Sequence, residues 1–522
     1  MSMLRTRMGA FLLASLTAFY VRADDLQAVW ADDECGGTQG SDKSSCAFHA
    51  LQRKGHQTRQ DPDALSAIPE EGMNVTTAAT PMTPPAYNAS NGEGALTHTR
   101  GTGPLSNPPK KALDYAGMAW EDMSFPGTQE MHFLAVGDWG GMDGGVVTDG
   151  QRPGKEYYRV IQYKGGDADG PHVMARSRML CGFDPLVNCF AEKGGPGCNS
   201  MCGFTPGVDD QAQILVAREM QKLAEKVKPV LVLNVGDNFY WGGIEVDCGT
   251  PMGEISPVAK HQFDAVYENI YKGPGLDGVP WLSVLGNHDW GGVYFNSGWD
   301  QQIAYTWASD RWIMPAPYWS QHVNFPDQGF SVDIFMIDTN VFDAHGPGSL
   351  SEPSHDICGV GGPSTQNCAS QGGPPSREEC HDWFQDFWHT QKKWLKKSLL
   401  KSKANWQIVN THFPCGTAMP WYFELHTQYG LDLLVTGHRH DQELWDNSGL
   451  MGGLTCVVTG GGGGITSEES PQGLNGPSQY GFFDFAVSKK KIKVELINQN
   501  GQVLKQSIIH PVKGALVAGW KT

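Results

Sequence analysis

Short apolar runs recur between residues 131 and 497, and many of them end in a small polar motif. A run of about four to eight apolar residues bounded by turn-forming residues is typical of a buried strand. The chain therefore predicts strands over residues 132–136, 230–235, 281–285, 330–337, 406–409, 431–435, 454–458, 482–487 and 492–497.

Two segments between these strands have helical spacing instead. In residues 209–228 the apolar side chains, Val216 and Met220 among them, fall on one face of a helix, and residues 383–400 are a second candidate. Strands that alternate with helices predict an α/β sandwich. The polar motifs follow the strand ends, which form the edge at which open α/β sheets bind ligands.

The N-terminus has the pattern of a secretory signal peptide. Arg5 and Arg7 precede an apolar run over residues 8–21, and a cleavage site follows at Ala23, so residues 1–23 are expected to be removed. The alternative is a signal anchor that stays in the membrane, but the run is short for a span, which needs about 20 residues.

Residues 24–118 lack apolar periodicity and are rich in Pro, Thr, Ser, Asn and Gly. This composition predicts a poorly ordered linker or pro-region, with a folded N-terminal β-domain as the alternative. The catalytic domain is expected over residues 119–514. Within it, residues 141–208 and 343–381 are rich in Gly, Pro and Cys and predict disulfide-stapled surface insertions.

All 12 cysteines follow the predicted cleavage site, and an even number in an exported chain favours disulfides. Their connectivity cannot be read from the sequence. Four of them offer a zinc site as the less favoured alternative: Cys181, Cys189, Cys198 and Cys202.

Charge and targeting features limit the classes of binding partner and the location that the sequence predicts. The formal net charge of −17 argues against nucleic-acid binding, so an anionic substrate must be attracted locally. Sequons at Asn74 and Asn88 predict glycans. No segment after the signal is apolar enough to cross a bilayer. We expect a secreted protein, or one in the lumen of the secretory or lysosomal pathway, without membrane attachment after signal cleavage.

Oxygen and imidazole donors follow five of the predicted strands. Two metal ions held close together need a shared carboxylate to offset their repulsion, terminal ligands on each side, and open positions for water and substrate. Tyrosinate suits Fe(III), whereas imidazole and amide oxygen suit Fe(II), Zn(II) or Mn(II). The donors are Asp138, Asp237, Tyr240, Asn287, His288, His412, His438 and His440.

The five motifs resemble the signature of the purple acid phosphatases, most closely the small, tartrate-resistant kind within the binuclear, calcineurin-like metallophosphoesterase superfamily. They are GDWG (137–140), GDNFY (236–240), GNHD (286–289), VNTH (409–412) and GHRH (437–440). The resemblance covers roughly residues 130–500 and includes the tyrosine that other binuclear metallophosphoesterases lack. It implies a four-layer αββα sandwich of two mixed sheets flanked by helices.

The resemblance also implies a role for each donor. Asp237 would bridge the two ions, and His288 would be catalytic without binding metal, assisting the leaving group while a metal-activated hydroxide attacks phosphorus in line. The remaining ligands would be Asp138, Tyr240 and His440 for Fe(III), and Asn287, His412 and His438 for a divalent Fe, Zn or Mn ion.

The implied activity is that of an acid phosphatase acting on monoesters, either small phosphate esters or phosphoproteins. One alternative is a phosphodiesterase or nucleotidase that uses the same site. The other is a non-catalytic scaffold that retains the fold.

Three departures from the family pattern stand out. Arg439 replaces a small polar residue, and it would either face solvent or attract phosphate. Thr411 stands where glycine is common, and residues 414–422 lack the second active-site histidine of the small enzymes, with His426 the nearest candidate. The two insertions would be able to cover or reshape the site.

Overall fold

The computed structural model describes residues 107–148, 156–162, 172–174, 208, 211–240, 242–292, 294–346, 356–359, 365–446, 451–464 and 480–512. All of them belong to one structural unit, residues 86–522. The predicted signal peptide, the two sequons and the cysteine cluster at Cys181–Cys202 lie outside the described residues.

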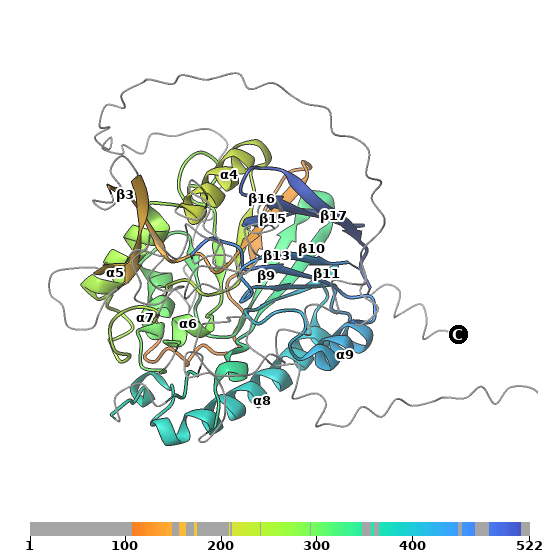
Figure 1. Cartoon of the computed structure of the whole chain (residues 1–522). Helices are drawn as coiled ribbons and strands as arrows, with labels where there is room; N and C mark the ends of the chain where they lie inside the picture. The colour runs from red at the N-terminus through yellow and green to blue at the C-terminus, as the bar shows by residue number, and fades with distance from the viewer. Residues whose placement is uncertain are drawn as a thin grey trace, which may run out of the picture. The chain divides into compact units, whose positions relative to one another are not determined.

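Two seven-stranded mixed sheets form the centre of the fold (Figure 1). The first has the order β1 (Met123–Ser124), β9 (Trp319–Phe325), β10 (Phe330–Met336), β11 (Trp406–Asn410), β12 (Leu433–Thr436), β14 (Thr455–Thr459), β13 (Gln442–Trp445). The second has the order β17 (Val503–Ile509), β16 (Ile492–Asn498), β15 (Gly481–Val487), β2 (Met131–Val136), β6 (Leu231–Asn234), β7 (Trp281–Ser283), β8 (Trp312–Ile313).

Each sheet contains a run of four parallel strands: β10, β11, β12 and β14 in the first, and β2, β6, β7 and β8 in the second. A third, smaller sheet lies in the predicted insertion at 141–208. It consists of β3 (Met142–Thr148), β4 (Glu156–Gln162) and β5 (His172–Met174).

The space between the two large sheets is filled by alternate residues of their strands. Phe133 and Ala135 of β2 pack there with Val332 of β10 and Ile408 of β11. Leu134, between them in sequence, faces the opposite side and joins the core beneath the helices. Because both faces of β2 are covered, its residues 133–136 form a continuous apolar run.

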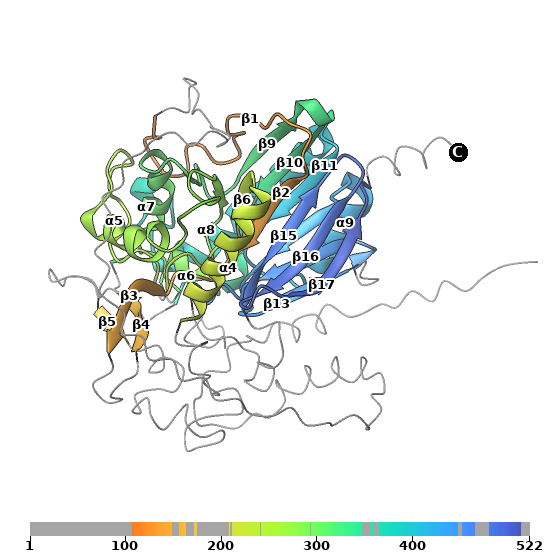
Figure 2. The ribbon, with the colours of Figure 1, turned by 90° about the horizontal axis from the view of Figure 1, so that it is seen from above.

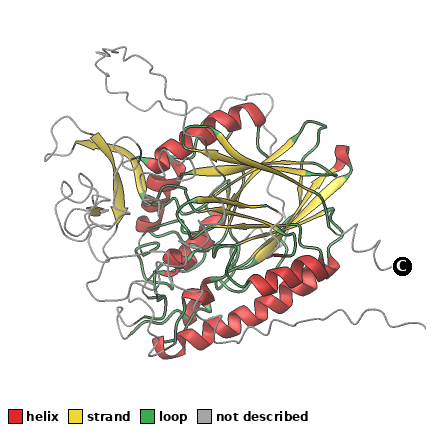
Figure 3. Ribbon diagram, turned by 45° about the vertical axis from the view of Figure 1, so that its right-hand side comes forward, coloured by secondary structure: helices red, strands yellow, loops and turns green. Residues whose placement is uncertain are grey.

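Helices cover the outer faces of both sheets (Figure 3). Helix α4 (Ala212–Val227) packs on the second sheet near β15, as Figure 2 shows. Helices α8 (Arg377–Lys401) and α9 (Met419–Tyr429) cover the first sheet. The shorter helices are α5 (Pro257–Phe263), α6 (Asn287–Trp290) and α7 (Trp299–Ala304), together with η3 (Asp264–Glu268), η4 (Tyr305–Trp307), η5 (Pro326–Gln328), η6 (Asn340–Asp343) and η7 (Ala369–Gln371).

This arrangement confirms the predicted fold class of two mixed sheets flanked by helices. Among the described residues, no helix combines the length and apolar character that a membrane span requires. Residues 107–118, which the sequence placed in the linker, are part of the fold: Ala112 is buried and its backbone N–H donates to the Gln371 side chain.

Three disulfides join described cysteines, which confirms the prediction of disulfides for these six of the 12 cysteines. Cys248–Cys368 and Cys358–Cys380 fasten the predicted insertion at 343–381 to the domain and to α8. Cys415–Cys456 ties the loop after β11 to β14, across 41 residues of chain.

Removing the Cys415–Cys456 bridge by Cys415→Ala with Cys456→Ala should lower the free energy of unfolding by about 2–4 kcal/mol. The reason is that a cross-link over a loop of this length restricts the unfolded chain. Urea unfolding of the variant and the wild type measures the difference. A change below about 0.5 kcal/mol would contradict the stabilising role.

Candidate metal centre

The eight donors predicted from the sequence lie at the carboxyl ends of parallel strands in both large sheets. Asp138 follows β2, Asp237 and Tyr240 follow β6, and Asn287 and His288 begin α6 after β7. From the first sheet, His412 follows β11, and His438 and His440 follow β12. The structure brings all eight into one cluster, in which only His438 is more than marginally exposed.

Three of these residues adopt the left-handed backbone conformation, with φ of 57° at Asp138, 50° at Asp237 and 72° at His438. Such conformations cost about 1–3 kcal/mol each in non-glycine residues and persist where surrounding contacts hold them, often at functional sites. Glycines next to these carboxylates provide the space that they occupy. A Cβ at Gly286 would lie 2.0 Å from Asp237 Oδ1, and one at Gly437 would lie 2.5 Å from Asp138 Oδ2.

The Tyr240 hydroxyl is the centre of a first donor group. It lies 3.3 Å from Asp138 Oδ1, 2.9 Å from Asp237 Oδ2 and 3.1 Å from His440 Nε2. Two carboxylates, a phenol and an imidazole therefore converge, and all four side chains are buried.

A second donor group surrounds the side-chain oxygen of Asn287. His412 Nε2 lies 2.9 Å and His438 Nδ1 lies 3.3 Å from this oxygen, and the two imidazole nitrogens are 3.3 Å apart. His412 Nε2 is also 3.4 Å from Asp237 Oδ1.

Asp237 belongs to both groups, since Oδ2 faces Tyr240 and Oδ1 faces His412. Bonds of about 2.1 Å to a central ion place neighbouring ligand atoms about 3–3.4 Å apart in octahedral or tetrahedral geometry. The spacings of 2.9–3.4 Å around Tyr240 and Asn287 agree with this range. The donor set therefore fits two metal ions that share Asp237. Within this set, Asp138, Asp237 and His412 offer ligand atoms that all lie within 4.8 Å of one another.

Charges in this buried cluster are strongly coupled. Burial raises the pKa of Asp138 well above its usual value. Burial also favours a raised pKa at Asp237, but His412 and His288 outweigh it and hold that pKa well below the usual range. Burial lowers the pKa of His412, whereas the Asp237 carboxylate raises it to about 9. Such concentrations of perturbed ionisable groups are typical of functional sites.

Hydrogen bonds to two residues outside the donor set, Val235 and Asp289, help to fix the positions of the donor atoms. His412 Nδ1 donates to the Val235 carbonyl at 2.9 Å, which leaves Nε2 for the cluster. The buried Asp289 carboxylate accepts from the backbone N–H groups of Gly286 at 2.7 Å and Asn238 at 2.9 Å, so it joins the loop of Asn287 to the loop of Asp237. The motif pattern alone does not reveal this role, although Asp289 is the last residue of the GNHD motif.

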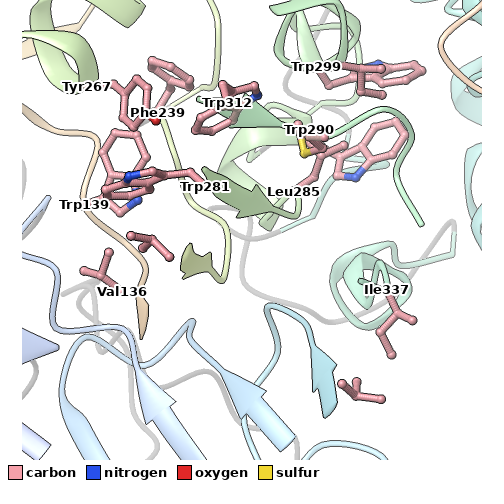
Figure 4. Packing of buried hydrophobic residues seen from close by; sticks show 14 of the residues in the cluster. Val136, Trp139, Phe239, Tyr267, Trp281, Leu285, Trp290, Trp299, Trp312 and Ile337 are labelled. Carbon is pink, nitrogen blue, oxygen red and sulfur yellow. The ribbon is translucent and has the colours of Figure 1, made fainter. Parts of the chain in front are cut away.

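A buried aromatic cluster packs against the loops that carry Asp138 and Tyr240. Figure 4 shows Trp139, next to Asp138, packed among Phe239, Tyr267, Trp281 and Trp312. The Trp139 ring centroid lies 6.1 Å from that of Phe239 and 5.7 Å from that of Tyr267. Trp139 and Phe239 are next to proposed ligands in sequence. Their packing therefore fixes the backbone positions from which the side chains of Asp138 and Tyr240 extend.

The structure also places two further residues whose roles the sequence left open. Arg439 pairs with Glu443, and its side chain is only 14% exposed, so it does not extend freely into solvent. His426 donates from Nδ1 to the Leu431 carbonyl at 2.6 Å, beyond the end of α9. That hydrogen bond gives His426 a structural role, because it joins α9 to the segment that follows it.

Residues 131–442 match the family model described as calcineurin-like phosphoesterase. The chain belongs to this family. Among curated proteins, this phosphoesterase is similar to tartrate-resistant acid phosphatase type 5 of Homo sapiens, with 25% identity over 321 residues that cover 55% of this chain and 83% of the relative. It is also similar to purple acid phosphatase 7 of Arabidopsis thaliana, with 25% identity covering 56% of this chain and 80% of the relative.

Solved structures give weaker likenesses. Purple acid phosphatase PPD1 from yellow lupin matches at 15% identity with a TM-score of 0.35, covering 74% of the phosphoesterase and 55% of that chain. GAP50, the anchor in the inner membrane complex of Plasmodium, matches at 16% identity with a TM-score of 0.40, covering 74% and 90%. The curated relatives support phosphoester hydrolysis and imply a binuclear metal centre, consistent with the buried Asp138, Asp237 and His412.

Proposed function

We propose that the protein is a secreted acid phosphatase that hydrolyses phosphate monoesters at a binuclear Fe(III)–M(II) centre, where M is Fe, Zn or Mn. The observation that supports this most directly is the Tyr240 hydroxyl, which lies 2.9–3.3 Å from donor atoms of Asp138, Asp237 and His440. A phenolate is a hard anionic donor that suits a trivalent ion.

In this proposal Asp138, Tyr240 and His440 hold the Fe(III). The other ion is held by Asn287, His412 and His438, and Asp237 bridges the two. The ions would supply an activated water for in-line attack on phosphorus and would neutralise charge on the phosphoryl oxygens. The protein's part is to fix these donors in a buried cluster, where electrostatic interactions are stronger than in water.

His288 has the proposed role of proton donor to the leaving oxygen. Its backbone N–H donates to Asp237 Oδ1 at 3.0 Å, which fixes the residue beside the bridging carboxylate. Its ring contacts the Tyr240 ring, with centroids 4.7 Å apart. The residue is therefore held beside the bridging carboxylate and the Tyr240 ring, a position from which the imidazole would be able to transfer a proton.

The partners follow from this chemistry. We propose small phosphate monoesters or phosphoproteins as substrates, with no nucleic-acid or membrane partner. The signal-like residues 1–23 favour the extracellular space or the lumen of the secretory and lysosomal pathway.

The test is metal analysis and a visible spectrum of the purified protein, run beside a panel of phosphate monoesters and diesters. We expect two metal ions per chain, a coloured protein and a preference for monoesters. Faster hydrolysis of the diesters would indicate the phosphodiesterase alternative, and no hydrolysis by metal-loaded protein would indicate the scaffold.

Tyr240→Phe should bleach the colour, because a phenolate on Fe(III) gives a charge-transfer band in the visible and a phenyl ring does not. Absorption spectra at equal protein concentration measure this. The matched control is Tyr422→Phe, which removes a hydroxyl from another buried tyrosine, on α9, and should keep the colour. Iron-loaded wild type without colour would show that the tyrosine assignment is wrong.

A further inference from the structure

A run of five glycines, residues 460–464, follows β14 and lies outside the five ligand motifs. All five residues are buried. Glycine loses the most conformational entropy on folding, so five buried in succession need a compensating reason. Close contacts with the metal centre supply one.

The backbone of this run pairs with the loop that carries Asp138. The Gly462 N–H donates to the Gly137 carbonyl at 3.1 Å, and the Gly464 N–H donates to the Asp138 carbonyl at 2.9 Å. The Gly137 N–H in turn donates to the Thr459 carbonyl at 2.9 Å. The end of the first sheet is thereby fastened to the first ligand motif of the second sheet.

Gly464 also lies against the ring of Tyr240. A Cβ at this position would be 2.8 Å from both Cδ2 and Cε2 of the ring and 2.7 Å from the backbone carbon of Trp139. Contacts below 3.0 Å force something to shift. The φ of Gly464 lies outside the left-handed region, so an alanine would be resisted by lack of space and not by backbone strain.

The ring that meets Gly464 has little freedom elsewhere. Its hydroxyl oxygen lies 2.9 Å from Asp237 Oδ2, and the ring packs against the tilted His288 ring with centroids 4.7 Å apart. A displacement of a few tenths of an ångström at Cδ2 and Cε2 therefore moves the phenol oxygen relative to the other donors, because the ring is rigid.

We propose that Gly464 is a positioning residue that sets the place of the Tyr240 phenol oxygen, and with it the integrity of the Asp138–Tyr240–His440 half of the metal centre. Its missing side chain leaves the space that the ring occupies. This role rests on the proposed function, in which Tyr240 is a metal ligand.

Gly464→Ala should therefore affect one half of the centre selectively. We expect loss of one of the two metal equivalents, with the visible band shifted or bleached, while the ion at Asn287, His412 and His438 is retained. Elemental analysis and absorption spectra measure both, independently of activity. The matched control is Gly242→Ala, two residues from Tyr240, where a Cβ meets nothing closer than 3.8 Å.

A double-mutant cycle shows whether Gly464 acts through the phenol. In the Tyr240→Phe background, where the oxygen is already absent, Gly464→Ala should cause no further metal loss, so the two effects are not additive. Additive losses would overturn the proposal, and so would a Gly464→Ala protein with two metals and a wild-type spectrum.

Misfolding of Gly464→Ala has its own test. If the ring is what the new methyl meets, adding Tyr240→Ala should restore a cooperative thermal transition. If that double variant also fails to fold, the glycine is required by its contact with the Trp139 backbone and not by the Tyr240 ring. That result would overturn the proposal. The proposed function fails separately, if wild-type protein binds no metal or hydrolyses no phosphate ester.

Discussion

Asp237→Asn is expected to lose bound metal and at least about three orders of magnitude in kcat/KM. Asp237 is the one carboxylate whose two oxygens face different donor groups, with Oδ2 at 2.9 Å from the Tyr240 hydroxyl and Oδ1 at 3.4 Å from His412 Nε2. Two cations a few ångströms apart repel each other, and the shared negative charge offsets that repulsion. An amide supplies no net charge, and several kcal/mol of lost stabilisation correspond to a factor of about a thousand.

The measurement is metal content by elemental analysis together with kcat/KM for a phosphate monoester. The matched control is Asp484→Asn, which removes another buried carboxylate, bonded to His132 at 2.9 Å on the second sheet. That variant should lose stability while keeping both metals. Full metal occupancy in Asp237→Asn would show that this residue does not bridge.

Most of the strands that the sequence predicted correctly have both faces buried, whereas β10 and β16, which were also predicted, alternate between buried and partly exposed residues over their first half. The predicted run at 132–136 corresponds to β2, Met131–Val136, in which every residue is buried. The sequence missed β9, where buried and partly exposed residues alternate, and β17, an edge strand with several exposed residues. A search for continuous apolar runs easily misses a strand with one solvated face along its whole length, because its polar residues interrupt the run.

The helix predicted at 383–400 is longer in the structure, Arg377–Lys401. Its N-cap is Ser376, whose side chain accepts from the Glu379 backbone N–H. The Ser-x-x-Glu spacing is a helix-start signal that apolar periodicity does not use. The first five residues of α8 were therefore assigned to the insertion at 343–381.

The donor cluster was predictable for a physical reason: its members are polar residues that directly follow apolar strands, and parallel strands bring such ends together. The support for that cluster was harder to predict. Gly464 and Tyr240 are more than 200 residues apart in sequence. The only sign of their steric contact in the sequence is that residue 464 has no side chain. Contacts that depend on a missing atom have no signature in residue chemistry.

His288 is the residue whose proposed role makes the sharpest distinction between substrates. It is 3% exposed, its backbone is fixed to Asp237, and its ring contacts Tyr240. Replacing a general acid costs about 10²–10⁴ in rate. The cost should depend on the leaving group: an aryl phosphate with an acidic phenol departs without a proton, whereas an alkyl phosphate has a basic alkoxide that needs one. His288→Ala should therefore slow alkyl esters by that factor and aryl esters only slightly.

The comparison requires kcat for one aryl and one alkyl phosphate in wild type and His288→Ala, with metals quantified in both proteins. Metal content should stay at the wild-type value, because His288 is not a ligand in the proposed centre. His426→Ala is the matched control: it removes another buried histidine, bonded to the Leu431 carbonyl, and should change neither rate. If His288 only orients its neighbours, both esters slow by the same factor, because misplaced ligands impair attack on phosphorus whatever the leaving group. Equal penalties, or a loss of metal, would therefore remove His288 from the leaving-group step.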